Sequence, residues 1–239
     1  MTYLISFLAV CNGLALLLVL ILLLRGPFRK FWVVLFYVAW ELMATLTLTG
    51  LNLLYNDPAQ LNNESLKAAM RLYARLYWGN DVIVDLLRFI LVIVLTYRSI
   101  PEGASRVRTG RVLSGVVAAA ILLPFLLFPM GSQTWPKGAW FNSTSELLNF
   151  GAAIMNLGLW GTLIANRQRD RQFVSVSIGL GVLVTGTAIS YGVKHFAQNS
   201  SIPNVFLMLV QLGAWVVWCL AFRPVPVRRV AADKALQSL

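Results

Sequence analysis

The chain has few charged residues, and acidic residues are the scarcest of them. Only 12% of its 239 residues are charged, with nine Asp and Glu against 20 Lys and Arg. Because a water-soluble globular domain carries about 25% charged residues, this composition excludes a water-soluble enzyme and a disordered segment. The net charge of +11 is typical of nucleic-acid-binding proteins, but 58% hydrophobic residues and a mean hydropathy of +0.72 exclude that class as well.

Histidine and cysteine are nearly absent, which removes most metal and haem chemistry. The single histidine, His195, does not suffice for a haem held by two histidines or for a histidine-rich metal site. The two cysteines, Cys11 and Cys219, fall at different depths of their predicted helices and cannot pair. No H-E-x-x-H, G-x-S-x-G, Walker A or C-x-x-C motif occurs. We therefore predict a protein that is not an enzyme and that has no covalent cofactor and no metal held by His or Cys, while contacts with lipid or a pigment stay open.

Long apolar runs are what the sequence has in abundance. Seven of them reach or approach the ~20 residues that a helix needs to cross ~30 Å of hydrocarbon. They cover residues 4–24, 31–54, 72–97, 112–129, 147–165, 173–193 and 204–222. Their continuity favours helices over barrel strands, in which apolar and polar residues would alternate. We predict an all-α membrane protein, with one seven-transmembrane-helix bundle over residues 1–222 and a short basic tail over 223–239.

The basic residues predict how the chain is threaded. Fourteen of the 20 fall on one side, in the connections after the first, third and fifth runs and in the tail, whereas five fall on the other side. The positive-inside rule makes the first side cytoplasmic, with the N-terminus outside and the C-terminus cytoplasmic. The first run lacks a preceding basic segment and a following cleavage pattern, so we expect it to remain in the protein. We expect the membrane to be a bacterial cytoplasmic (inner) membrane.

Two local patterns bear on helix packing. Small residues at spacings of four, namely Ser177, Gly181 and Thr185 together with Gly186 and Ser190, predict two faces of close packing in the sixth helix. The connection over 131–145 contains three tryptophan and phenylalanine side chains, at positions 135, 140 and 141, which is typical of the aromatic belt at a membrane surface.

Ionisable residues inside the apolar runs are the strongest candidates for function, since each costs roughly 2.5–3.5 kcal/mol at the centre of a span. Glu41 lies in the second run, and Asp81, Asp85 and Arg88 lie in the third, where spacings of four and three put them on one helix face. We predict a Glu41–Arg88 contact between helices or a local Asp85–Arg88 pair. Two interpretations stay open: a structural ion pair that fixes helix packing, or a polar cavity or proton path lined by Asp81 and Asp85.

A second polar group is predicted near the outer surface. Arg71 and Arg75 precede the charged stripe of the third helix, Glu146 begins the fifth helix, and Lys194 and His195 end the sixth. These residues form either an outward-facing vestibule or a solvated rim at the membrane surface.

The third run also invites one family comparison. Seven spans with an outside N-terminus, and the sequence from Arg75 to Asp81, faintly resemble the microbial rhodopsins and their third helix. In that family retinal is bound to a lysine in the middle of the last helix, and residues 204–222 contain none. The family is therefore rejected.

Three function classes fit these observations. The leading prediction is a non-catalytic integral membrane subunit or interaction protein of a larger membrane assembly, because no connection is long enough for a folded domain and a catalytic set is lacking. The alternative is a small-solute or proton-coupled carrier that uses the charged stripe of the third span, although matched interruptions in two halves, usual in carriers, are not found. The second alternative is a seven-helix membrane sensor without its own output domain. The expected partners are the lipid bilayer and other membrane subunits, and not nucleic acid.

Overall fold

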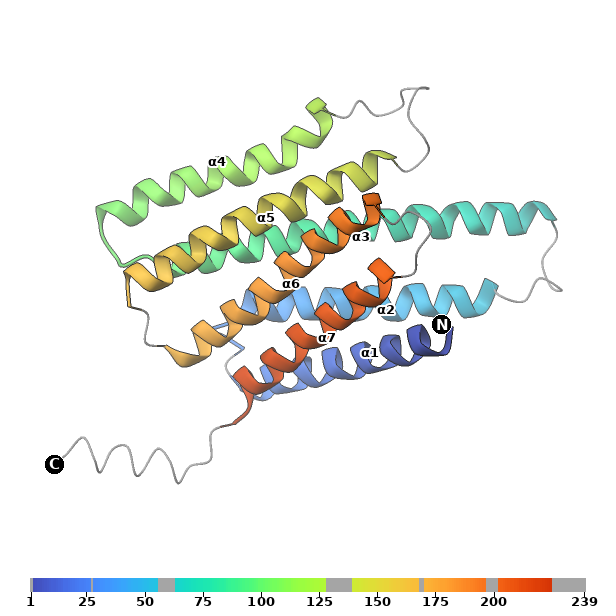
Figure 1. Ribbon diagram of the computed structural model, residues 1–239, viewed down its shortest axis with the longest axis horizontal. Coiled ribbons are helices and arrows are strands. Elements are labelled where there is room, and N and C mark those ends of the chain that lie inside the picture. Colours follow the sequence, from blue (N-terminus) through green and yellow to red (C-terminus); the bar gives the residue numbers. More distant parts are fainter. Residues whose placement is uncertain are drawn as a thin grey trace.

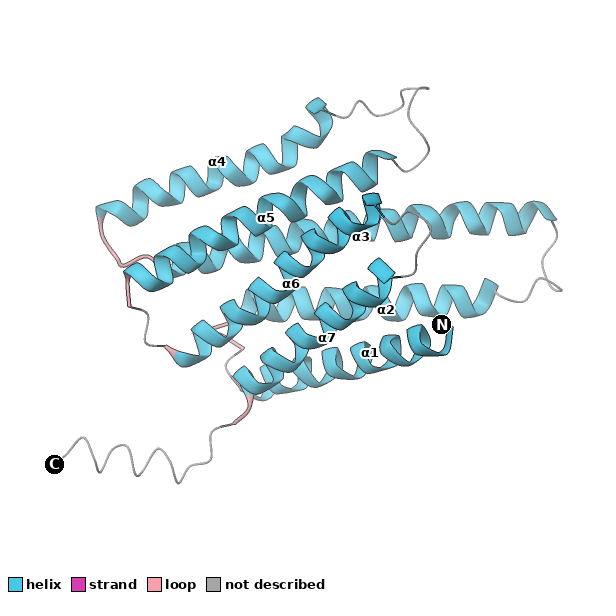
Figure 2. Ribbon diagram, viewed as in Figure 1, coloured by secondary structure: helices cyan, strands magenta, loops and turns pink. Residues whose placement is uncertain are grey.

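The computed structural model describes residues 2–26, 28–55, 63–127, 139–167, 170–196 and 202–224, and within these ranges every regular element is a helix (Figures 1 and 2). The helices are α1 (Thr2–Arg25), α2 (Trp32–Tyr55), α3 (Asn63–Ser99), α4 (Ala104–Leu127), α5 (Ala139–Ala165), α6 (Arg171–Phe196) and α7 (Ile202–Phe222). The predicted all-helical class is confirmed for this part of the chain.

Six of these helices, all but α3, are long and apolar enough to cross a membrane. A polypeptide with six such helices is a multi-pass integral membrane protein. Helix α3 differs because it contains the charged stripe Asp81, Asp85 and Arg88, and because it is much longer than the others. Its 37 residues span roughly 56 Å at 1.5 Å per residue, and Figure 1 shows it extending past the ends of its neighbours.

The helices pack as a closed ring of six with the seventh outside it. Around the ring, α1 contacts α2, α2 contacts α3, α3 contacts α5, α5 contacts α6, α6 contacts α7, and α7 returns to α1. Helix α4 packs only against α3 and α5, and it lies at the edge of the molecule in Figure 1. This difference also appears in the burial of the two helices. In the most apolar stretch of α6, 67% of the residues are buried, compared with 11% in the corresponding stretch of α4.

The interior of the ring is filled mainly by aliphatic and aromatic side chains. The largest fully buried ones are Trp215, Trp218, Tyr37, Phe31, Leu23, Leu91, Leu95, Leu159, Leu180, Leu183, Val19 and Val34. The two tryptophans contact each other and the Tyr37 ring, with ring centroids 5.3 to 6.0 Å apart. These contacts join α2 to α7 across the ring.

Helices α3 and α5 begin nine and eight residues earlier than their apolar runs predict. The placement of Trp140 and Phe141 in a connection is therefore wrong, because both lie in the first turn of α5. The Phe141 ring stacks on Trp78 of α3 at 6.1 Å, and the Trp140 ring packs at 5.3 Å against Phe125 of α4. An apolar run marks where a helix meets hydrocarbon, whereas backbone hydrogen bonding continues the helix into polar sequence. Position 135 lies outside the described residues.

The small residues of α6 face two different neighbours. As predicted, the Gly186 and Ser190 face is a site of close packing: a Cβ on Gly186 would lie 2.3 Å from Val210 of α7, and the Ser190 hydroxyl donates to a backbone oxygen of α7 at 3.0 Å. Gly181 instead faces α5. Thr185, predicted to share that face, is exposed, so the second packing face is shorter than the spacing suggested.

A second close approach of α6 to α7 occurs at a glycine that the four-residue spacing did not predict. A Cβ on Gly179 would lie 2.4 Å from both Cδ1 and Nε1 of Trp218. The indole Nε1 of Trp218 also donates to the backbone oxygen of Val176 at 3.0 Å. The tryptophan can therefore reach the α6 backbone only because position 179 has no side chain.

We expect Gly179→Ala to displace the Trp218 ring and lower the free energy of unfolding by about 1–3 kcal/mol, the usual cost of overpacking a filled core. Gly192→Ala is the matched control on the same helix, since a Cβ there has nothing within 4 Å. Thermal unfolding of both variants in detergent, followed by tryptophan fluorescence, measures the difference. Equal melting temperatures would contradict the proposed role of Gly179.

Polar contacts join three segments at the end of the bundle where α1 ends and α6 begins. The segments are the connection between α1 and α2, the end of α3 and the start of α6. The Lys30 ammonium pairs with the Asp170 carboxylate, and the Arg98 guanidinium donates to the backbone oxygen of Lys30. Asp170 Oδ1 also accepts from the backbone N–H groups of Gln172 and Phe173 at 3.1 and 3.3 Å, so it caps the N-terminus of α6. Burial by itself would raise the pKa of Asp170, but these hydrogen bonds outweigh it and hold the pKa below its ordinary 3.8.

The lowered pKa of Asp170 has a defined consequence for stability. The contribution of its carboxylate is present above the unfolded-state pKa and is lost as the pH falls through the lower pKa of the folded state. We expect Asp170→Ala to lower the free energy of unfolding by about 1 kcal/mol at neutral pH, as for other lost N-caps, and by less in acid. Melting temperatures across pH test this, and Glu102→Ala, at a largely exposed carboxylate, is the control.

Candidate functional site

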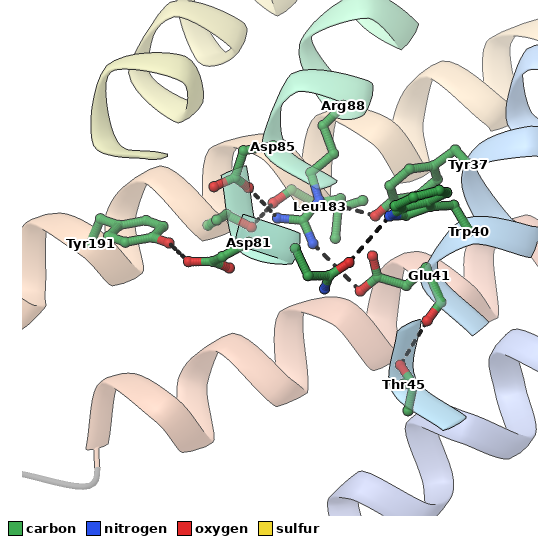
Figure 3. Close-up of polar contacts among 11 residues, drawn as sticks. Tyr37, Trp40, Glu41, Thr45, Asp81, Asp85, Arg88, Leu183 and Tyr191 are labelled. Atoms are coloured by element: carbon green, nitrogen blue, oxygen red, sulfur yellow. Dashed lines mark hydrogen bonds and ion pairs between the residues drawn. The ribbon is translucent and has the colours of Figure 1, made fainter. Parts of the chain in front are cut away.

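The site lies inside the helix ring, where α2 and α3 face each other (Figure 3). Arg88 is at its centre. Its Nη1 donates to Asp85 Oδ1 at 2.9 Å, its Nε donates to the Tyr37 hydroxyl at 3.0 Å, and its Nη2 lies 3.8 Å from Glu41 Oε1. Arg88 is 4% exposed and Asp85 is 1% exposed, so this ion pair is in the protein interior.

Helical spacing on both helices explains why these four groups meet. Tyr37 and Glu41 are four residues apart on α2, and Asp85 and Arg88 are three apart on α3, so each pair occupies one face. The two contacts that the sequence predicted as alternatives, Glu41–Arg88 and Asp85–Arg88, are both present.

The hydrogen bonding of the two carboxylates is incomplete. Glu41 Oε2 and Asp85 Oδ2 are buried and make no hydrogen bond of acceptable geometry within the described part of the chain. A single guanidinium charge therefore faces two carboxylates, each with one oxygen unsatisfied. Burying uncompensated charge costs several kcal/mol, so a site of this kind favours an additional positive charge, such as a proton on one carboxylate.

A row of polar side chains leads from this pair to a third carboxylate, Asp81. Asp81 Oδ2 accepts a hydrogen bond from the hydroxyl of Tyr191 on α6 at 2.9 Å. Ser145 of α5 lies beside both Tyr191 and Asp85, although its hydroxyl makes no hydrogen bond of good geometry. Asn149, one turn further along α5, also borders Asp85. Tyr191 of α6 thus lies near both the partly exposed Asp81 and the buried Asp85 of α3, and Figure 3 shows these three side chains together.

A small cavity lies beside the cluster, between α2 and α3. Its volume is about 350 Å³, and Trp40 and Asn80 form part of its wall. Trp40 Nε1 donates to Asn80 Oδ1 at 3.2 Å, which closes the wall next to Glu41. Arg75 lines the same cavity.

Beyond Arg88, toward the end of α3, the ring is mainly apolar and also contains a few buried polar side chains, namely Thr96 and Ser99 of α3, Asn156 of α5 and Ser177 of α6. Leu91 and Leu95 of α3 are fully buried, and the Tyr37 ring, whose centre lies 6.0 Å from the Arg88 guanidinium, contacts Trp215 and Trp218. The hydroxyls of Thr96, Ser99 and Ser177 donate to backbone oxygens of their own helices, and Asn156 Oδ1 is buried without a hydrogen bond. Within the described part of the chain, none of these four side chains is hydrogen-bonded to Asp85 or Arg88.

The residues predicted to surround an outer vestibule lie on three helices, α3, α5 and α6. The Lys194 ammonium lies 5.9 Å from the centre of the Tyr191 ring, whereas Arg75 belongs to the cavity between α2 and α3. Arg71 is exposed on α3, and Glu146 is partly buried on α5. The side chain of His195 lies outside the described residues.

Sequence reasoning identified all four charged members of the cluster but missed its neutral members. Tyr37 had a usable signal, because it lies four residues before Glu41. Tyr191 and Ser145 had none, since their contribution depends on how α5 and α6 are rotated about their axes.

Comparison of the chain with protein-family models, with curated proteins and with solved structures finds no match. Within the described ranges, no group of three or more His, Cys, Asp and Glu residues is placed to hold a metal ion. Function is therefore argued from the geometry of the site.

We expect Arg88→Met to lower the free energy of unfolding by about 3–5 kcal/mol, because it leaves two buried carboxylates without their cation. Adding Glu41→Gln and Asp85→Asn to this variant removes both negative charges and is expected to restore most of the loss. Arg75→Met, at an exposed arginine of the same helix, should change stability by no more than about 0.5 kcal/mol. Melting temperatures of the purified proteins measure all three, and a triple variant no more stable than Arg88→Met would contradict the charge argument.

Proposed function

We propose that all seven helices cross the membrane, with the N-terminus outside and the C-terminus cytoplasmic. Helix α3 is as much a part of the ring as its neighbours, which supports a seventh span despite its charges. Those charges point into the protein, where they do not meet lipid. The start of α1 and the end of α7 lie at opposite ends of the bundle in Figure 1, as an odd number of spans requires. The positive-inside distribution of basic residues then gives the direction.

For function, we propose a non-catalytic membrane sensor that takes up a proton from the outer side at the buried carboxylate cluster. The observation that carries this proposal is the excess of carboxylates: Asp81, Asp85 and Glu41 accompany one guanidinium, and two of their oxygens are buried without a hydrogen bond. Protonation of either carboxylate removes a buried negative charge. On Glu41 of α2 it weakens the attraction to Arg88 of α3, whereas on Asp85 it removes the partner of Arg88 within α3 and strengthens the attraction of Arg88 to Glu41. A change of proton concentration is thereby converted into a change of helix packing.

The direction of access favours a sensor over a carrier. Asp81 is partly exposed and accepts from Tyr191, and both Tyr191 and Ser145 lie beside Asp85. We propose that a proton reaches Asp85 from this side. At Arg88 the route meets the apolar and aromatic core. A proton that enters from the outer side is bound there, because no hydrogen bond among the described side chains joins Asp85 or Arg88 to the polar residues further along the ring.

Infrared difference spectroscopy of the full chain in nanodiscs tests the proton site. As the pH is lowered from about 8 to about 4, we expect a carbonyl band of a protonated carboxylic acid to appear, and Asp85→Asn or Glu41→Gln to remove or shift it. Glu102→Gln is the matched control, because the Glu102 side chain is 92% exposed. A band unaffected by both cluster variants would overturn the proposal.

A second measurement separates the sensor from the carrier. In sealed vesicles with a pH-sensitive dye inside, a sensor leaves the internal pH unchanged after an outside acid pulse, whereas a proton carrier acidifies the interior. Acidification that is abolished by Asp85→Asn would establish the carrier instead.

The second candidate function is the membrane subunit that the sequence favoured. Its supporting observation is helix α4, which stands outside the ring and exposes large apolar side chains such as Val112 at 64%, Leu122 at 58% and Leu126 at 79%. A partner helix could cover this face as readily as lipid. Gentle extraction followed by identification of what co-purifies tests this role independently of the proton site.

A further inference from the structure

A second and larger cavity lies between α3 and α4, at the end of the bundle where these helices are connected. Its volume is about 590 Å³, within the usual range of ligand pockets. The side chains at its connected end are basic or polar, namely Tyr97, Arg98 and Arg106. Those further in are mainly aliphatic, namely Ile90, Ile93, Val94, Leu113 and Val117, together with Ser114.

The gradient from basic to aliphatic follows from the antiparallel arrangement of the two helices. Along α3, Ile90 precedes Arg98 by eight residues, roughly 12 Å. Along α4, Val117 follows Arg106 by eleven residues, roughly 16 Å. Both helices therefore place an arginine at the connected end and aliphatic side chains toward the middle of the bundle.

The two arginines are incompletely satisfied. The Arg106 guanidinium lies 4.8 Å from the centre of the Tyr97 ring and donates to the largely exposed Glu102 carboxylate at 3.1 Å, but its Nε is buried without a hydrogen-bond partner. Arg98 donates to the backbone oxygen of Lys30, and this oxygen carries no negative charge to balance the guanidinium. No acidic side chain is among the residues that line the cavity.

We propose that this groove binds an anionic glycerophospholipid of the inner leaflet, with its phosphate between Arg98 and Arg106 and an acyl chain along Ile90, Leu113 and Val117. Charge complementarity selects this occupant, because basic pockets between membrane helices on the cytoplasmic side attract anionic headgroups. The proposal rests on the proposed crossing of α3 and α4 and not on protonation of the cluster. It also accounts for the position of α4 outside the ring, since the lipid fills the space that helix packing leaves between α4 and α3.

Native mass spectrometry of the full chain, released from detergent containing either phosphatidylglycerol or phosphatidylcholine, tests the site. We expect phosphatidylglycerol to be retained preferentially. The double variant Arg98→Gln, Arg106→Gln should weaken this retention by roughly fivefold for each arginine, with no change for phosphatidylcholine. The matched control is Arg108→Gln, Arg111→Gln, which removes the same charge from exposed positions of α4 that do not line the cavity.

A second variant tests the acyl-chain part of the groove without changing charge. Val117→Trp fills the apolar end and should also displace phosphatidylglycerol, while Leu122→Trp, at an exposed position of the same helix, should not. Equal retention of the two lipids, equal losses from the two arginine variants, or displacement of phosphatidylglycerol by inorganic phosphate would each overturn the proposal. Asp85→Asn should retain the lipid, so failure of the lipid site and failure of the proton site are distinguishable.

Discussion

A single positive charge enclosed by helices sets the conditions for the rest of this structure. Arg88 cannot reach water, so its compensation has to come from the protein: Asp85 on its own helix and Glu41 and Tyr37 on α2. These contacts fix the relative height and rotation of α2 and α3. Since Tyr37 also packs on Trp215, the same charge is linked to α7. The polar site and the apolar core are therefore in direct contact, and a change at the carboxylates affects the packing of α2, α3 and α7.

The ring has two regions with different physical character. In one half, close apolar packing holds the helices together, because the glycines of α6 leave room for Trp218 and Val210 and the leucines are fully buried. The other half is held by hydrogen bonds and charges among Asp81, Tyr191 and Asp85. Apolar contacts change little with pH, whereas the ion pairs and hydrogen bonds depend on whether each carboxylate is protonated. Such a division gives a protein one rigid part against which another can move.

The sequence predicted the position of residues along each helix better than the side of the helix that faces a given neighbour. Glu41 and Arg88 could be matched because each is a known number of residues from the end of an apolar run. The partnership of Tyr191 with Asp81 could not be predicted, since nearly uniform apolarity leaves the rotation of α6 unspecified. The same limitation explains α3 and α4. By composition α3 is the least membrane-like helix and α4 an ordinary span, yet α3 belongs to the ring and α4 stands outside it, because buried charges need neighbours and aliphatic side chains are also stable in lipid.

The length of α3 has a mechanical consequence. From Arg88 to the start of the helix at Asn63 the distance is roughly 37 Å, and the helix is continuous over that length. A continuous helix turns as a rod. A tilt of a few degrees about the guanidinium moves its far end by several ångströms, while atoms near the pivot shift by fractions of one. Any tilt of α3 about the buried cluster is therefore largest at the end that extends beyond the bundle.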